Sequence, residues 1–203
     1  MNKSLGKIFL AGGLLIAMVV LGRALFYAPN DAVDSGLPVA TTTATSTPQR
    51  VSVPGPLPDL LLIPRLGIEA DVQHLGVTKT GNMAAPNNFT DVSWYKLGTL
   101  PGETGSAVMS GHEDNAIALD GVFKHLEDLQ IGDPVFVVDG NGEKLEFRVT
   151  EKAVYPYDRS PTERIFNATG KARLVLITCA GDWLPKAKTN DKRLVVYTEL
   201  VNR

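Results

Sequence analysis

Short apolar runs separated by turn-forming residues dominate the chain from Asp59 onward. They end at glycine, proline, asparagine or aspartate, which is the pattern typical of β-strands. The runs lie at residues 60–64, 70–77, 105–112, 133–155, 173–179 and 193–201. Strands this short favour a closed barrel or a sandwich over a βαβ fold. The sequence therefore predicts an all-β domain at residues 59–203.

Two segments of this domain give more specific signals. In residues 134–149, two alternating apolar runs flank Asp-Gly-Asn-Gly at 139–142, which predicts a hairpin. In residues 120–129, the apolar side chains recur at about the helical period. This second segment predicts a short helix packed against the sheet.

The first 28 residues predict a membrane anchor. Lys3 and Lys7 precede an uncharged run at residues 8–22. Continuing through Arg23, whose guanidinium can reach the headgroups, to Ala28 gives the length that a spanning helix needs. Positive charge before the span predicts a single-pass protein with a cytoplasmic N-terminus. The alternative is a cleaved signal peptide. Phe26 argues against cleavage after Ala28, and both interpretations export the domain.

Residues 29–58 differ in composition from both neighbours. They are rich in Pro, Thr, Ser and Ala and contain no aromatic residue. Such a segment has no aromatic side chain to nucleate a core. It predicts a flexible linker between the anchor and the domain.

Charge and cysteine content exclude several classes of function. The chain has 20 Lys and Arg against 22 Asp and Glu, a net charge of −2, which argues against nucleic-acid binding. Cys179 is the one cysteine, so the chain has no intrachain disulfide and no multi-cysteine zinc or iron–sulfur site.

Cys179 is a candidate nucleophile. It ends the apolar run at 173–179 and precedes the turn-prone residues 180–182. A thiol at such a strand exit can be partly exposed, as a nucleophile must be. The alternative is a small buried apolar side chain. A free thiol in an exported domain is unusual, which favours reactivity.

His112 is the best candidate for proton transfer among the three histidines. It ends the strand-like stretch at 105–112, and its ordinary pKa allows both protonation states near neutrality. His74, within a predicted strand, and His125, on the predicted helix, fit packing or surface roles. The run of His112, Glu113 and Asp114 does not predict a metal site, since neighbours on an extended chain point to alternate faces.

Arg193 opens the last apolar run. Strand alternation puts it on the same face as Val195, Tyr197 and Glu199, which is expected to be the outer face. An arginine there can be a solvated charge at a strand end. It can also be a fixed cation aimed at a developing oxyanion.

Taken together, these features resemble the sortase family of cysteine transpeptidases. The resemblance covers residues 60–201 and rests on His112 in SGHED, Cys179 in LITCAG and an arginine before the last strand. The order WY, PGE, GSAV and GH at residues 94–112 is most similar to class E and class F sortases. Many class F members carry Tyr-Arg-Asp-Asn before the last strand, whereas this chain has Asn-Asp-Lys-Arg at 190–193. Lys192 is the alternative cation if that alignment is shifted.

The resemblance implies an eight-stranded sortase barrel with one or two short helices and a groove on its outer face. Cys179 would cleave a sorting motif resembling LPxTG near the C-terminus of an exported protein, through an acyl-thioester. His112 would transfer protons and Arg193 would stabilise the oxyanion. Ser110, Ile177 and Thr178 would line the groove, and residues 155–167 match the loop that shapes substrate choice.

The resemblance also implies the partners and the location. The acceptor would be an amine on a cell-wall precursor or on another protein, at the outer face of a bacterial membrane, and no cofactor or metal is implied. Two other functions remain open. One is a cysteine peptidase whose acyl-enzyme is resolved by water, and the other is a membrane-tethered β-barrel that only binds ligands.

Overall fold

The computed structural model describes residues 34–38, 56–114 and 120–201, with main chain only for 34–38. The predicted membrane anchor at residues 1–28 lies outside these residues. In the part of the chain that is described, no helix is long and apolar enough to cross a membrane. Most of the predicted linker at 29–58 also lies outside, so the predicted boundaries at 28 and 58 stay predictions.

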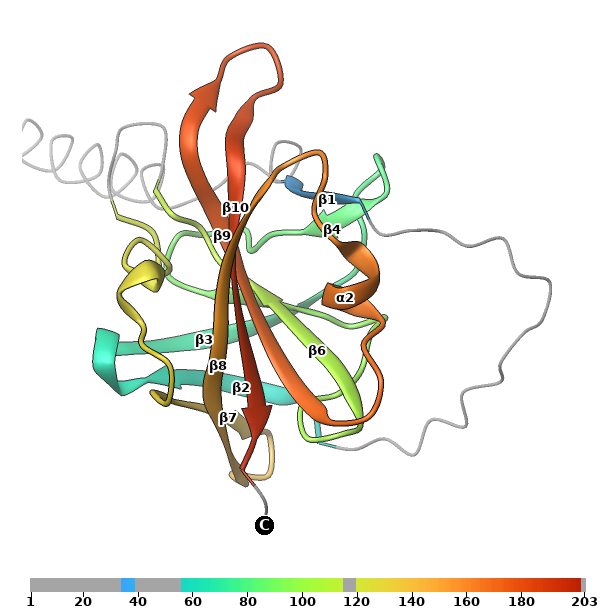
Figure 1. Cartoon of the computed structure of the whole chain (residues 1–203). Helices are drawn as coiled ribbons and strands as arrows, with labels where there is room; N and C mark the ends of the chain where they lie inside the picture. The colour runs from blue at the N-terminus through green and yellow to red at the C-terminus, as the bar shows by residue number, and fades with distance from the viewer. Residues whose placement is uncertain (1–33, 39–55, 115–119, 202–203) are drawn as a thin grey trace, which may run out of the picture.

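Eight strands form a closed barrel in the order β10-β8-β7-β2-β3-β5-β6-β9 (Figure 1). This confirms the predicted all-β barrel. The strands are Pro58–Ile63 (β2), Ile68–Leu75 (β3), Val92–Tyr95 (β5), Gly105–Ser110 (β6), Pro134–Asp139 (β7), Lys144–Pro156 (β8), Ala172–Leu184 (β9) and Thr189–Leu200 (β10). The pairs β3–β5 and β6–β9 are parallel, and the other pairs are antiparallel.

A two-stranded sheet lies beside the barrel. Its strands are β1 (Asp34–Pro38) and β4 (Asn82–Ala84), which pair antiparallel. β1 falls within the segment that the sequence predicts as a linker. That segment therefore contributes main-chain hydrogen-bonding groups to a sheet.

The predicted hairpin is confirmed as β7 and β8. The Asp139 carboxylate accepts hydrogen bonds from the main-chain amides of Asn141 and Glu143, each at 2.9 Å. Gly142 has φ +81°, a conformation that glycine adopts without steric cost. Local turn chemistry thus sets the register of this pair.

The prediction of a short helix over residues 120–129 is wrong. Turns lead into a three-residue 3₁₀ helix, η2 (Leu126–Asp128). The amides of Lys124, Leu126 and Asp128 donate to carbonyls three residues earlier, which is the bonding of turns and 3₁₀ helices and not of an α-helix. The apolar side chains nevertheless enter the core as expected: Phe123, Leu126 and Leu129 are fully buried.

The sheet at β6, β9 and β10 is covered on both faces. Side chains that alternate along these strands fill two clusters. The interior cluster fills the barrel and includes Ala107, Met109, Leu174, Leu176, Leu194 and Val196. The outer cluster comprises Met83, Tyr95, Val108, Ile165, Phe166, Val175, Ile177, Val195 and Tyr197. Its covering element is the short helix α2 (Thr162–Phe166). Arg193, two positions before Val195, belongs by alternation to the outer side, as predicted.

β5 was not predicted as a strand. All four of its residues are buried, so the alternation that marks a half-exposed strand is absent. Val92 and Trp94 join the interior cluster, whereas Tyr95 joins the outer cluster. The Ser93 hydroxyl donates to the carbonyl of Ala84 at 2.9 Å, which satisfies this polar side chain beneath the surface.

Burial in the barrel predicts that truncating an interior side chain destabilises the fold far more than truncating an exposed one. Phe147 is 0% exposed and Ile131 is 73% exposed. Phe147→Ala should lower the free energy of unfolding by about 3–5 kcal/mol, because it leaves a cavity. The control Ile131→Ala should change it by no more than about 0.5 kcal/mol. Urea unfolding measures both, and equal losses would contradict this assignment of the core.

Candidate active site

Cys179 and Arg193 lie directly opposite each other on β9 and β10. Paired residues on neighbouring antiparallel strands face the same side with their Cβ atoms about 5 Å apart. Neither residue lies at a strand end, which corrects two expectations. β9 continues past Cys179 to Leu184, and β10 begins at Thr189, before Arg193.

The turn expected at residues 180–182 is instead a β-bulge. The register runs from Lys192 opposite Ala180 to Asn190 opposite Trp183, so Gly181 and Asp182 together face Asp191 alone. Gly181 has φ +79°, which bends the strand without ending it. The β9–β10 hairpin therefore projects well beyond the barrel (Figure 1).

Four neighbouring groups and its own burial set the acidity of Cys179, which is half-buried. Burial is the largest effect and raises the pKa of the thiol. The positive charge of Arg193 lowers this pKa, whereas the carboxylates of Glu113 and Asp114 raise it. A hydrogen bond from the main chain of Asn190 lowers it further. Groups from two separate chain segments, β10 and the residues after β6, therefore act on the Cys179 sulfur.

The guanidinium of Arg193 is held by its own hairpin. Its Nη1 donates to the carbonyls of Asn190 at 3.0 Å and Lys192 at 2.8 Å, and Nη2 donates to the Thr189 hydroxyl at 2.5 Å. The ring of Tyr157 lies 5.9 Å from Cζ. Arg193 is 0% exposed, which excludes the interpretation as a solvated charge at a strand end.

The parallel pairing of β6 with β9 brings His112 to the level of Cys179. Ser110 is the partner of Ile177, and the amide of Gly111 donates to the carbonyl of Ile177 at 3.2 Å. Extending this register by the same step on both strands sets His112 beside Cys179. The proton-transfer candidate and the thiol therefore leave the barrel at the same rim.

The imidazole of His112 is fixed by the segment that follows β4. Nε2 lies 3.0 Å from the carbonyl of Pro86, and the ring packs against Phe89 with centroids 4.6 Å apart. A carbonyl only accepts, so Nε2 carries the proton and Nδ1 is the basic nitrogen of the neutral ring. Behind it, a Cβ on Gly121 would lie 2.4 Å from the carbonyl oxygen of His112, so glycine is required there.

The three residues predicted to line a groove are buried beside these groups. The Ser110 hydroxyl shares a 2.8 Å hydrogen bond with Ser93, and Thr178 donates to the carbonyl of Gly111 at 2.9 Å. Ile177 belongs to the outer cluster. Ser110 and Thr178 therefore help to hold the end of β6, which precedes the histidine, and the part of β9 that carries the cysteine.

The other two histidines are engaged elsewhere. His74 Nε2 lies 2.6 Å from the carbonyl of Pro58, and the ring meets Trp94 edge-on. His125 lies 3.6 Å from the Asp128 carboxylate. Within the described residues, no group of three or more His, Cys, Asp or Glu side chains is arranged to hold a metal ion.

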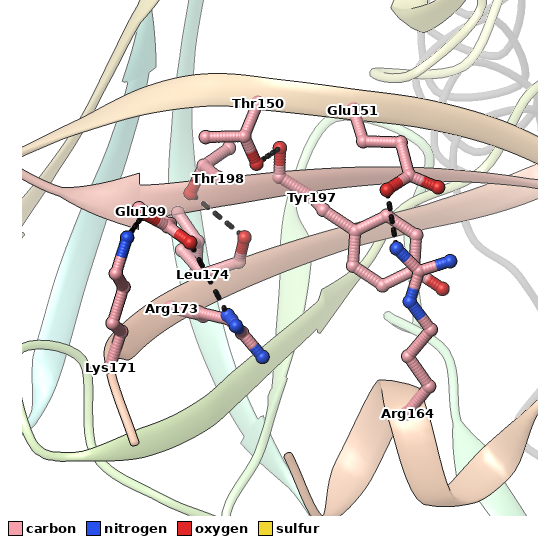
Figure 2. A network of polar contacts seen from close by, with 9 residues as sticks. All are labelled: Thr150, Glu151, Arg164, Lys171, Arg173, Leu174, Tyr197, Thr198 and Glu199. Atoms are coloured by element: carbon pink, nitrogen blue, oxygen red, sulfur yellow. Dashed lines mark hydrogen bonds and ion pairs between the residues drawn. The ribbon is translucent and has the colours of Figure 1, made fainter. Parts of the chain in front are cut away.

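A polar network fastens α2 to the outer face of the barrel (Figure 2). Arg164 binds the Glu151 carboxylate and donates to the Tyr155 hydroxyl at 3.2 Å. Its guanidinium also lies 4.4 Å from the centre of the Tyr197 ring. The hydroxyls of Tyr155 and Tyr197 are 3.3 Å apart. Arg164 thus fastens α2, within the segment matched to substrate choice at residues 155–167, to β8 and β10.

Sequence reasoning missed the residues that hold the candidates in place. These are Pro86, which anchors His112, and Thr189, Asn190 and Asp191, which surround Arg193 and the bulge. Pro86 and Asn190 act here through their main-chain carbonyls, which leave no signal in the choice of side chain, and the side chains of Thr189 and Asp191 find their partners only once the bulge is formed. The one available signal was Gly181, which was interpreted as part of a turn.

The burial of His112 predicts an unusual titration. Burial lowers the pKa of this imidazole, and the Pro86 carbonyl and the Asp114 carboxylate only partly oppose it. The midpoint of its NMR titration should therefore lie below about 6.5. His112→Gln identifies the resonance by its loss.

The same shift predicts a dependence of stability on pH. The unfolded chain binds the proton more tightly than the folded chain. The contribution of His112 is therefore present above the unfolded pKa of about 6.5 and is lost as the pH falls through the folded value. An NMR titration midpoint of His112 at or above about 6.5 would contradict both the lowered pKa and this dependence of stability on pH.

Comparison with known proteins agrees with the barrel fold. Residues 61–201 match the sequence model of the sortase domain. No curated protein sequence matches the chain.

Solved sortase structures share the fold. Sortase A from Corynebacterium diphtheriae, a lid mutant, is 24% identical, with a TM-score of 0.57 over 82% of this chain and 85% of that chain. Sortase C-1 from Actinomyces oris is 21% identical, with a TM-score of 0.54 over 74% and 77%. A Clostridium perfringens sortase D5 transpeptidase is 18% identical, with a TM-score of 0.53 over 72% and 79%. Because the family match spans most of the chain, the protein belongs to the sortase family and is a cysteine transpeptidase.

Proposed function

We propose that this sortase uses Cys179 as its nucleophile, His112 as its proton-transfer group and Arg193 as its oxyanion-stabilising cation. One observation carries the proposal: the cross-strand pair of Cys179 and Arg193 lies at the rim where the parallel strand β6 delivers His112. This arrangement supports a site in which the three types of side chain needed for acyl transfer come from distant parts of the sequence.

In the acylation step, the Cys179 sulfur attacks the carbonyl carbon of the scissile peptide bond in a sorting motif resembling LPxTG. The thiol proton passes to Nδ1 of His112, and a C–S bond forms. The C–N bond then breaks, and the imidazolium gives its proton to the departing amine. The product is an acyl-thioester on Cys179.

In the second step, an amine attacks the thioester. Neutral His112 takes a proton from this amine as the new C–N bond forms. The C–S bond breaks, and the imidazolium returns the proton to the departing sulfur, which restores the Cys179 thiol. The acceptor is an amine on a cell-wall precursor or on another protein. Water would resolve the same intermediate in the hydrolytic alternative.

The electrostatics of the site favour proton transfer during attack over a stable ion pair. Burial raises the pKa of the Cys179 thiol and lowers that of the His112 imidazole. Both groups are therefore mainly uncharged near neutral pH. Arg193 opposes this effect at the sulfur, because its fixed charge favours the thiolate.

The remaining parts of the proposal concern binding and location. The substrate peptide lies along the outer side of β9 and β10, near Ser110, Ile177 and Thr178, under the segment at 155–167. The similarity of the sequence motifs supports class E or class F. Residues 1–28 hold the protein in a bacterial membrane, with the catalytic domain outside.

Thioester trapping tests the nucleophile. The purified protein, incubated with a library of LPxTG-like peptides, should gain the mass of an acyl fragment, and adding an amine should release a ligated product. Cys179→Ala should form neither species while its unfolding midpoint stays close to wild type. Product formed by Cys179→Ala would refute the assignment. An adduct that only water resolves, with every amine tried, would favour the peptidase alternative.

Replacement of arginine by lysine tests the oxyanion role. Arg193→Lys keeps the charge but loses the planar fork that makes several hydrogen bonds at once, so kcat should fall by about tenfold or more. Arg173→Lys is the matched control. Arg173 is also in this sheet, but it pairs with Glu199 at 3.8 Å, toward the far end of β10 (Figure 2). A wild-type rate for Arg193→Lys would remove the case for oriented contacts.

A further inference from the structure

We propose that Asp191 is a positioning residue for this reaction, holding the β-bulge that places the main chain of Asn190 against Cys179 and Arg193. The proposal rests on the catalytic roles proposed above for Cys179 and Arg193. Asp191 itself would touch neither the substrate nor the reacting atoms.

The Asp191 carboxylate fills the concave side of the bulge. Its Oδ1 accepts a hydrogen bond from the main-chain amide of Asp182 at 2.8 Å. A Cβ on Gly181 would lie 2.0 Å from this same oxygen. The carboxylate therefore occupies the space that a side chain at position 181 would need. Gly181 at φ +79° and the Asp191 acceptor form one interlocked unit.

Beside the bulge, the main chain of Asn190 contacts both proposed catalytic groups on these strands. Here the Asn190 carbonyl accepts from Arg193 Nη1 at 3.0 Å, and the Asn190 main chain also binds the Cys179 sulfur. The Asn190 side chain donates to the carbonyl of Gly181 at 3.2 Å, which ties it back to the bulge.

Asp191 also joins the hairpin to the segment that covers the outer face. Its carbonyl accepts from the amide of Tyr157 at 3.0 Å, and the Tyr157 ring lies near the Arg193 guanidinium. Lys192 lies 3.8 Å from the carboxylate on the exposed side. One residue thus links the bulge, the cation and the start of residues 155–167.

The test compares three variants of the full chain. Asp191→Ala removes the acceptor. Asp191→Asn removes the charge but keeps an oxygen that can accept from the Asp182 amide. Asp182→Ala is the matched control, because only the main-chain amide of Asp182 makes this bond, so the variant deletes a neighbouring carboxylate and keeps the contact.

Asp191→Ala should lower kcat for transpeptidation by about tenfold to a hundredfold with little change in KM, since it misplaces groups around the nucleophile. Asp191→Asn and Asp182→Ala should stay within a factor of about two or three of wild type. Gly181→Ala should reproduce the loss from the opposite side of the bulge. Each variant is assayed below its unfolding transition.

The pH dependence of Cys179 alkylation by iodoacetamide gives a second readout. The charged groups acting on this sulfur are Arg193 from β10 and Glu113 and Asp114 from the segment after β6. Loss of the Asn190 contact in Asp191→Ala removes an influence that lowers the thiol pKa, so the midpoint should move to higher pH. Asp191→Asn should keep the wild-type midpoint.

Several outcomes would overturn the proposal. Equal losses in Asp191→Ala and Asp191→Asn would assign the effect to charge, and wild-type kcat in Asp191→Ala would show that the bulge needs no such support. An unchanged alkylation midpoint in Asp191→Ala would show that Asp191 does not hold the Asn190 main chain against the Cys179 sulfur. Failure of the proposed function is distinguishable, because the wild-type protein would then form no thioester on Cys179.

Discussion

The hydrogen-bonded pairing of β9 with β10 is the constraint on which the site depends. It closes the barrel through β8 on one side and β6 on the other, and it sets Cys179 opposite Arg193. The interior and outer clusters bury both faces of these strands, so their register cannot slip without exposing apolar side chains to water. The free energy gained by burying these apolar side chains offsets the cost of burying the polar groups of the site.

The site itself begins where this apolar cover ends. Arg193 is fully buried among main-chain carbonyls and a hydroxyl, whereas Cys179 on the facing strand is only half-buried. The imidazole of His112 is locked from behind by Pro86. Cation and imidazole are therefore held rigidly, while the sulfur stays accessible, and this division suits a nucleophile that must meet a large substrate.

Local patterns predicted most of the fold, because turns and strand alternation depend on near neighbours. The β7–β8 turn at Asp139 follows from its side chain alone, and the outer position of Arg193 follows from parity. Long-range partners decided the rest. Amides at 122 and 123 tie the start of their segment to distant carbonyls, and β5 lacks alternation because both its faces are buried. The bulge was missed because Gly181 has the same signature in a turn and in a bent strand.

The place of Cys179 within β9 has a mechanical meaning. β9 is flanked by β6 and β10, so the residue that would carry the acyl chain belongs to a strand bonded on both sides. A pull on this residue would be shared by main-chain hydrogen bonds to two neighbouring strands. A cysteine on a loop or an edge strand would have bonds to one neighbour at most.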